Sequence, residues 1–231
     1  MKPNIIYTHP RCTVITTKQD MQRMLETCQW AGRASHMSEP DPSTTDQFLE
    51  RWAVKAGHNS LLRYAHLTVE FASDRATLNQ LVRHTVGGVH TQESQRYVKY
   101  GTKKNPFTFV LPIGAEACGW MVTKGENSLK AAAKAYMQAI ADGYPAEYAR
   151  RFLPSCTKST MRTQFNLESW RHILKTRLAN KHAQADIRAL LIHVYDFMAQ
   201  WPWLVADITP CMDGIGNARQ FVWTKENGLP V

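Results

Sequence analysis

Two short segments of this chain alternate apolar and polar residues, and several longer segments repeat apolar residues at the spacing of a helix. The alternation over residues 65–71 and again over residues 106–112 is typical of β-strands with one buried face. Apolar residues recur every three or four positions over residues 74–86, 129–140 and 182–199, which predicts amphipathic helices. The chain is therefore predicted to be a helix-rich member of the α+β class.

The 231 residues show no internal repeat, low-complexity tract or break in composition, so we expect one domain over residues 1–231. No apolar run approaches the ~18 residues of a membrane-spanning helix, and the first residues lack the apolar core of a signal peptide. We expect a protein of the cytoplasm, or of the host-cell cytoplasm if the source is a virus, with no membrane partner. Residues 221–223 are apolar and are candidates for docking the C-terminal tail.

The chain is basic, because 28 Lys and Arg residues stand against 19 Asp and Glu residues and give a formal net charge of +9. This charge indicates an anionic partner, which could be nucleic acid, an acidic surface or a phosphorylated small molecule. The 5 cysteines form no CxxC pair, and His182 and His193 are too far apart on one helix to share a metal ion. We therefore predict a reducing compartment and no metal site.

The densest group of polar residues spans residues 83–97, where a glycine pair ends a predicted helix. Ser94 and Arg96 are two residues apart, so in an extended segment their side chains would point the same way. A hydroxyl beside a guanidinium suits a phosphate group, because the planar guanidinium donates two charge-assisted hydrogen bonds. The alternative interpretation is a solvated basic loop.

Two further groups have a structural explanation as well as a functional one. His58 and Ser60 precede the first predicted strand, where a histidine packed at a turn is the alternative to a ligand. His172 and Arg177 lie on a predicted helix, five positions and about 500° of rotation apart, so they would share only a broad face. Their alternative, and that of Arg150, is a charge on a solvated surface.

Taken together, these segments resemble the flavin-dependent thymidylate synthase family. The central family signature is RHR, seven residues, Ser and then Arg-Tyr, whereas this chain has Arg83-His84-Thr85, eight residues, Ser94 and Arg96-Tyr97. Four more family motifs are matched in order, namely R-x-S by Arg33-Ala34-Ser35, H-x-[ST] by His58-Asn59-Ser60, R-x-x-L-P by Arg150-Arg151-Phe152-Leu153-Pro154, and a late helical block by Asn166, His172, Arg177 and Ala183-Gln184-Ala185-Asp186-Ile187.

The resemblance implies mixed helices around a central, mainly antiparallel sheet, assembled as a homotetramer with active sites at subunit junctions. It also implies FAD as the cofactor, with NADPH and methylene-tetrahydrofolate as co-substrates. The expected reaction transfers a one-carbon unit to C5 of a pyrimidine nucleoside monophosphate, as in the conversion of dUMP to dTMP. No cysteine of the chain lies in a nucleophile motif, which agrees with such chemistry.

Carried over by position, the residues that resemble nucleotide ligands are Gln80, Arg83, Ser94, Arg96, Arg150 and Arg177. Ser94 and Arg96 would hold the phosphate. Arg150 and Arg177 would be catalytic, because a cation beside the pyrimidine stabilises negative charge on its carbonyl oxygens. The residues that resemble flavin contacts are Ser35, His58, Ser60, His84, Gln92, Asn166 and His172.

The chain departs from the family pattern in several places, among them a loop to Ser94 that is one residue longer and Tyr64 in place of a common His. Thr85 replaces the last arginine of the signature, Arg63 stands where the family often has Glu, and Glu168 stands where it often has Arg. The double exchange predicts that Arg63 and Glu168 pair with inverted polarity, the alternative being two independent surface changes. These departures leave open whether the substrate is dUMP, dCMP or UMP and whether the product carries a methyl or a hydroxymethyl group.

Two other functions fit the same residues. A basic nucleic-acid-binding protein would use the arginine segment together with aromatic residues as a stacking surface, although we favour a small nucleotide as the partner. A degenerate family member would bind nucleotide without catalysing the reaction, which would also account for Thr85 and Arg63.

Overall fold

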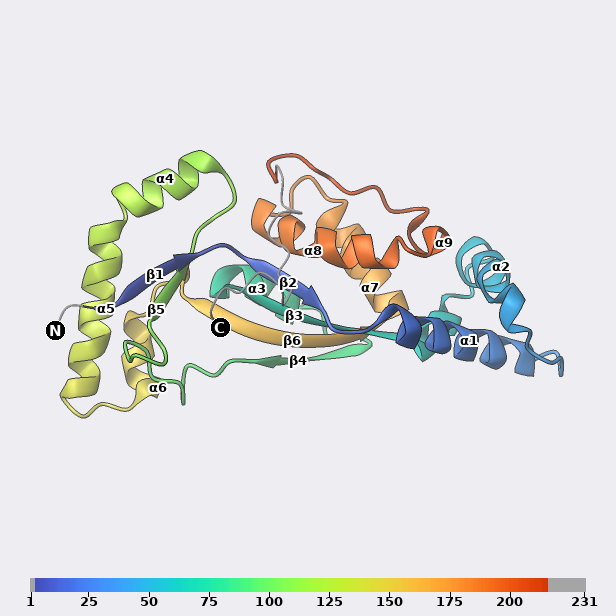
Figure 1. Ribbon diagram of the computed structural model, residues 1–231, viewed down its shortest axis with the longest axis horizontal. Helices are drawn as coiled ribbons and strands as arrows, with labels where there is room; N and C mark the ends of the chain where they lie inside the picture. The colour runs from blue at the N-terminus through green and yellow to red at the C-terminus, as the bar shows by residue number, and fades with distance from the viewer. Residues whose placement is uncertain (1–2, 216–231) are drawn as a thin grey trace.

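A four-stranded sheet lies at the centre of the molecule (Figure 1). The computed structural model describes residues 3–215, apart from the side chains of residues 115–117. The strands of the sheet follow the order β2 (Arg11–Val14), β3 (His66–Asp74), β6 (Lys158–Asn166) and β4 (Gly88–Gln92), and all neighbours are antiparallel. Two further strands, β1 (Ile5–Thr8) and β5 (Phe107–Val110), form a parallel pair.

Helices surround this sheet and confirm the predicted α+β class. The α-helices are α1 (Lys18–Ala34), α2 (Thr45–Leu49), α3 (Arg75–Val82), α4 (Ala115–Thr123), α5 (Glu126–Ala141), α6 (Ala146–Ala149), α7 (Leu167–Ile173), α8 (Ala185–Met198) and α9 (Pro202–Val205). Two π-helical segments, η2 (Glu50–Lys55) and η5 (Leu174–Leu178), continue α2 and α7. Three 3₁₀ segments complete the set, η1 (Pro42–Thr44), η3 (Asn59–Tyr64) and η4 (Arg150–Phe152).

The antiparallel pairing of β3 and β6 decides where the two adjoining helices begin. Asp74 ends β3 and caps α3, because its Oδ1 accepts a hydrogen bond from the backbone N–H of Thr77 (2.8 Å). Asn166 ends β6 and caps α7 in the same way, through the backbone N–H of Ser169 (2.9 Å). The two helices therefore start at opposite ends of the sheet. Helix α3 runs back along it, so that the residues after α3 return to the beginning of α7.

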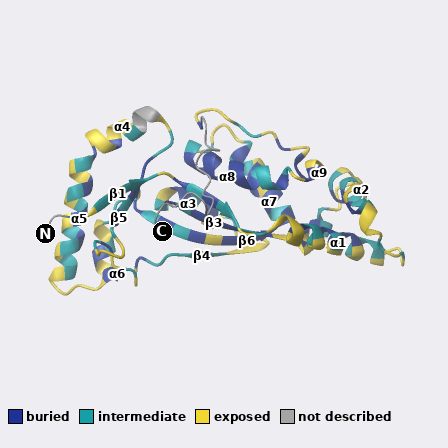
Figure 2. Cartoon of the chain, viewed as in Figure 1, coloured by how far each residue is buried: buried dark blue, intermediate teal, exposed yellow. Residues whose placement is uncertain are grey.

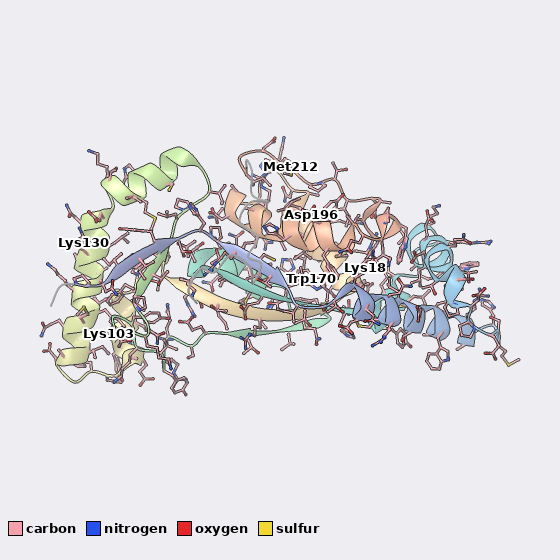
Figure 3. All side chains as sticks on the ribbon, in the orientation of Figure 1. Lys18, Lys103, Lys130, Trp170, Asp196 and Met212 are labelled. Atoms are coloured by element: carbon pink, nitrogen blue, oxygen red, sulfur yellow. The ribbon has the colours of Figure 1, made fainter. Side chains whose placement is uncertain are left out.

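The main hydrophobic core lies between one face of the sheet and helices α7 and α8. Leu67, Val69 and Phe71 of β3 are fully buried on this face. Trp170 packs where α7 meets the sheet (Figure 3), and its indole N–H donates to the backbone oxygen of Leu67 (2.9 Å). Helix α8 is buried along most of its length (Figure 2) and contributes many residues to this core.

A second, smaller hydrophobic core lies at one end of the molecule. Phe107 and Phe109 of β5 pack there against Tyr136 of α5, and all three side chains are fully buried. Figure 1 shows α4, α5 and α6 gathered at this end, whereas α1 and α2 extend from the opposite end. The molecule is therefore elongated, and the residues predicted to bind nucleotide and flavin are distributed along its long axis.

Most predicted elements are present, but several observed elements were not predicted. Residues 65–71 and 106–112 form β3 and β5, and the helices predicted over residues 74–86, 129–140 and 182–199 are α3, α5 and α8. Helices α1, α4 and α9 and strands β1, β2, β4 and β6 were not predicted. In β6 every second side chain is buried, but two of the buried side chains, Ser159 and Thr163, are polar. The sequence of β6 therefore lacks a clear alternation of apolar and polar residues. The candidate docking residues 221–223 lie outside the described part of the chain.

Over residues 3–215, no helix combines the length and the apolar composition needed to cross a membrane.

Candidate functional site

A cluster of basic side chains lies where the end of α3 meets α7 and η5. Arg177 donates through Nε to Nε2 of His84 (3.2 Å) and through Nη2 to the backbone oxygen of Gln80 (3.4 Å). The ring of His172 stands edge-on to that of His84, with 6.0 Å between the ring centroids. The structure thus brings together two predicted nucleotide ligands, Gln80 and Arg177, and two predicted flavin contacts, His84 and His172.

The π-helical geometry of η5 explains how His172 and Arg177 reach the same place. The backbone N–H of Ala179 donates to the oxygen of Leu174, five residues back (2.9 Å), so this turn is wider than an α-helical turn. The sequence prediction assumed an α-helix, on which the side chains of His172 and Arg177 would share only a broad face. The wider turn brings both of them onto His84, and such π-turns are frequent at functional sites.

His84 is a neutral acceptor within this cluster. Burial lowers the pKa of His84, and the positive charge of Arg177 lowers it further. Since Nε2 accepts the hydrogen bond from Arg177, the ring proton is assigned to Nδ1. Among the side chains that the structure describes, Arg177 has no carboxylate partner. Its positive charge is therefore available to an anionic or carbonyl-rich ligand.

A pair of glycines lets the loop after His84 lie directly against the end of β6. The backbone N–H of Asn166 donates to the oxygen of Gly87 (2.9 Å), and Gly87 has a φ of +76°. A Cβ on Gly88 would stand 2.1 Å from the ring of Phe165. The side chain of Asn166 is 7% exposed, and its Oδ1 already caps α7. As a flavin contact, Asn166 has its amide nitrogen as a donor, since its Oδ1 accepts the hydrogen bond that caps α7.

Three predicted flavin contacts lie apart from the cluster, around the end of α1 and the start of η3. Ser35 follows α1, His58 precedes η3 and Ser60 lies within it, and all three residues are exposed. The guanidinium of Arg33 lies over the ring of Phe48, 4.8 Å from its centroid. The Nε of Arg33 is buried and has no hydrogen-bond partner in the described structure. It is a donor that a ligand beside Ser35 would satisfy.

An ion pair connects η3 with the beginning of α7. Arg63 donates from Nε to Oε2 of Glu168 and from Nη2 to Oε1 (3.4 Å). The hydrogen bond to this carboxylate and its charge raise the pKa of Arg63. The predicted pair of inverted polarity is confirmed. Because Glu168 is two residues after Asn166, the pair ties the segment of His58 and Ser60 to the helix that carries His172.

Ser94 and Arg96 lie in a tight turn, which corrects the prediction of an extended segment. The backbone oxygen of Ser94 accepts hydrogen bonds from the N–H groups of Tyr97 (3.1 Å) and Val98 (3.0 Å). The hydrogen bonds between this segment and β6 end at Glu93, so the backbone after Glu93 is not held in an extended conformation and forms a turn. Within the turn, the backbone N–H of Arg96 donates to the Oγ of Ser94 (3.4 Å).

An ion pair also joins this turn to the segment of Arg150. The Nη2 of Arg96 lies 3.3 Å from Oε2 of Glu147 in α6, and Arg150 begins η4 directly after that helix. The contact brings the predicted phosphate ligands and Arg150 into one region. The sequence analysis missed Glu147. Its only signal is an acidic residue three positions before Arg150, a spacing at which two side chains would be neighbours on a helix.

The two remaining predicted residues are Arg83 and Gln92. Arg83 follows α3 directly, is exposed and precedes His84 in the chain. Gln92 ends β4, and its amide Nε2 is buried without a hydrogen-bond partner in the described structure. A buried donor without a partner is destabilising. A ligand that accepts a hydrogen bond from Gln92 would therefore bind without a further cost for removing water from this amide.

The predicted residues form three groups along the molecule rather than one crevice within the chain. The basic cluster lies at α3 and α7, the group with Ser35 lies at the end of α1, and the group with Arg96 and Arg150 lies beside α6 (Figure 1). An open hollow of about 540 Å³ lies between α5 and α6 and is lined in part by Tyr144 and Tyr148. None of the predicted ligands lines this hollow.

The five cysteines are free thiols. Burial raises the pKa of Cys12, raises that of Cys28 to about 12 and raises that of Cys156 to about 11. These three thiols are therefore protonated at neutral pH and poor nucleophiles. The sulfur of Cys211 accepts a hydrogen bond from Arg188 (3.1 Å), and its backbone N–H donates to the oxygen of Leu178, the residue after Arg177 (3.0 Å).

Comparison with known proteins decides the family. Residues 14–203 match the family model described as thymidylate synthase complementing protein, Thy1. The chain belongs to the Thy1 family. It is 30% identical over 183 residues to the flavin-dependent thymidylate synthase of Pyrococcus abyssi, which covers 75% of this chain and 74% of that protein. It is 32% identical over 153 residues to the enzyme of the same name from Geobacter sulfurreducens, which covers 66% of this chain and 64% of that protein. The resemblance found in the motifs is confirmed.

Solved structures share the Thy1-family fold of this chain. A UMP/dUMP methylase, PolB from Streptomyces cacaoi, bound with 5-Br UMP, superposes with a TM-score of 0.71 at 17% identity and covers 90% of this chain and 100% of its own. The same enzyme bound with 5-Br dUMP gives a TM-score of 0.70 at 16% identity, with 88% and 97% covered. At such identities the likeness establishes a common fold.

Proposed function

We propose that this Thy1-family chain transfers a one-carbon unit from methylene-tetrahydrofolate to C5 of a pyrimidine nucleoside monophosphate, with FAD as cofactor and NADPH as reductant. The observation that carries the proposal is the basic cluster. Gln80, His84, His172 and Arg177 were each matched to a family position from sequence, and they converge from α3, α7 and η5. Curated relatives that cover most of the chain are flavin-dependent thymidylate synthases.

The proposed phosphate site is the turn of Ser94 and Arg96. A hydroxyl and a guanidinium donate there to the phosphate oxygens. Arg83, which follows α3 beside His84, is proposed as a nucleotide ligand of the basic cluster. Arg96 is held by Glu147 in the free chain, but the two side chains are 54% and 42% exposed, so the ion pair is weak. A phosphate that accepts two hydrogen bonds from the guanidinium can displace this carboxylate.

Arg177 and Arg150 are the proposed catalytic residues. The contacts of Arg177 with His84 and with the backbone of Gln80 orient its guanidinium before a ligand binds. Directed at the carbonyl oxygens of the pyrimidine, a fixed cation stabilises the negative charge that develops as C5 forms its new bond. Because burial and Arg177 lower the pKa of His84, its ring stays neutral, and the positive charge of Arg177 is left to interact with the pyrimidine.

The residues proposed to hold FAD fit a large anionic cofactor. Arg33 and Gln92 provide buried donors that lack partners in the described structure, and oxygens of a dinucleotide would satisfy them. The side chains that would hold it are Ser35, His58, Ser60, His84, Gln92, Asn166 and His172. When bound, FAD supplies the reducing equivalents for the transferred one-carbon unit. No cysteine is needed as a nucleophile, which agrees with the buried, protonated thiols.

We further propose that the chain is a single-domain subunit of a cytoplasmic homotetramer. Its three groups of ligands lie along the long axis of one molecule, so that a complete site requires more than one copy (Figure 1). Val86 is 82% exposed and Tyr97 is 77% exposed, and both are neighbours of proposed ligands. A second copy that covers these apolar side chains would also supply the missing part of the site.

Two measurements on the purified full-length chain test the proposal. FAD added to the protein should give a bound-flavin absorbance spectrum. With methylene-tetrahydrofolate and NADPH, mass analysis should then detect a one-carbon addition to dUMP, dCMP or UMP, and the mass added distinguishes methyl from hydroxymethyl. Binding of FAD and nucleotide without any product would indicate a degenerate enzyme. A colourless protein that binds oligonucleotides in a salt-dependent manner would contradict the proposal.

A further inference from the structure

Glu93 and Tyr100 join the two ends of the turn that carries Ser94 and Arg96. The hydroxyl of Tyr100 donates to Oε1 of Glu93 at 2.5 Å. Glu93 directly precedes Ser94 and Tyr100 lies four residues after Arg96, and neither was among the predicted ligands. A single hydrogen bond between side chains thus closes the base of the turn.

Each partner of this bond is anchored separately. The backbone N–H of Glu93 donates to the oxygen of Thr160 in β6 (2.9 Å), and Arg75 donates to the backbone oxygen of Glu93 (3.4 Å). Tyr100 is 8% exposed, and its backbone N–H donates to the hydroxyl of Tyr136 in α5 (3.2 Å). Its ring stands edge-on to that of Tyr136, with 6.0 Å between the centroids. The bond therefore connects the sheet to the smaller hydrophobic core.

The position of Glu93 creates an electrostatic problem for an anionic ligand. Its carboxylate belongs to the residue directly before Ser94, and two negative charges at short range repel each other. The hydroxyl of Tyr100 holds this carboxylate against a buried ring instead. Burial raises the pKa of Tyr100, and the carboxylate of Glu93 raises it further, so the phenol remains a donor at neutral pH.

We propose that Tyr100 is a positioning residue that draws the carboxylate of Glu93 toward the core and away from the phosphate bound by Ser94 and Arg96. The proposal rests on the proposed function, because it requires the phosphate site at this turn. It assigns to Tyr100 a role in nucleotide affinity without any contact between Tyr100 and the nucleotide.

The test measures the affinity for dUMP, by titration calorimetry on the full-length chain, in Tyr100→Phe, Glu93→Gln and the double variant. Tyr100→Phe keeps the ring on Tyr136 but releases a charged carboxylate, and we expect dUMP binding to weaken about tenfold. Glu93→Gln removes the charge and should bind dUMP about as well as wild type. The double variant should recover the affinity lost in Tyr100→Phe, because no charge remains to be held.

Tyr7→Phe is the matched control, since it removes a phenol that packs against the same core but has no hydrogen-bond partner in the described structure. It should leave dUMP affinity unchanged. If Tyr100→Phe and wild type bound dUMP with equal affinity, this inference would be overturned but the proposed function would stand. A double variant as weak as Tyr100→Phe would also overturn it, because the lost bond rather than the freed charge would then be responsible. Wild-type protein that binds none of dUMP, dCMP and UMP would overturn both this inference and the proposed function.

Discussion

Arg63 of η3 and Glu168 of α7 form an ion pair in which the guanidinium donates to both carboxylate oxygens. In the family that the chain resembles, these positions often carry Glu and Arg instead. The exchange therefore keeps the attraction between two segments that hold proposed flavin contacts. Two independent surface changes would have left no reason for the side chains to meet.

The first prediction concerns this pair. Arg63→Glu places two carboxylates together and should lower the thermal unfolding midpoint by on the order of 1–2 °C, because an exposed pair contributes little. The double variant Arg63→Glu/Glu168→Arg should regain the wild-type midpoint. Thermal unfolding at low and high salt measures both, and salt should reduce the difference. A double variant that is no better than Arg63→Glu would argue against the pairing.

The second prediction is a pH dependence that arises from His84. Its pKa is lowered in the folded chain, so the unfolded chain takes up the proton first as the pH falls below about 6.5. Wherever the unfolded state binds more protons, stability falls with falling pH, so His84 destabilises the fold in acid and has no such effect above neutrality. His84→Gln should lose less stability than wild type between about pH 7 and pH 5.

Urea unfolding midpoints at the two pH values provide this measurement. His182→Gln is the control, because His182 is exposed and lies outside the cluster. It should show the same acid dependence as wild type. An identical pH profile for His84→Gln and wild type would contradict the burial of a neutral histidine beside Arg177.

The third prediction separates the roles of Arg96 and Glu147. Arg96→Ala should weaken dUMP binding by ~1.5–3 kcal/mol, because a charge-assisted hydrogen bond to phosphate is lost. Glu147→Gln removes the competing carboxylate at 3.3 Å and should strengthen dUMP binding a few-fold. Titration calorimetry on both variants gives the affinities. If Glu147→Gln binds dUMP more weakly than wild type, the ion pair organises the site rather than competing with the ligand.

The fourth prediction tests the close approach of β4 to β6. A Cβ on Gly88 would lie 2.1 Å from the ring of Phe165 and 2.3 Å from the backbone oxygen of Gln164, and the backbone cannot move aside without breaking the sheet. Gly88→Ala should destabilise the fold by ~1–3 kcal/mol. Gly119→Ala is the control, since no described atom outside the helix's own backbone lies within 4 Å of the Cβ it would add. Urea unfolding should show no loss of stability in the control.

The sequence by itself determined the elements that have a clean apolar period, and it supplied the residues proposed to bear the chemistry. Leu67, Val69 and Phe71 alternate without interruption, so β3 could be predicted, and the family motifs identified the cluster residues before any contact was known. It also predicted the Arg63–Glu168 pair, because opposite charges exchanged together imply that they touch.

Only the tertiary structure decided how these residues meet. Strand β6 buries Ser159 and Thr163 against the core, which no hydrophobic period can indicate, because their burial depends on neighbouring strands. The turn at Ser94 forms because pairing with β6 ends at Glu93, a fact of sheet register rather than of local propensity. The π-turn that brings Arg177 onto His84 is likewise set by packing, since hydrogen bonds five residues back have no signature in residue type.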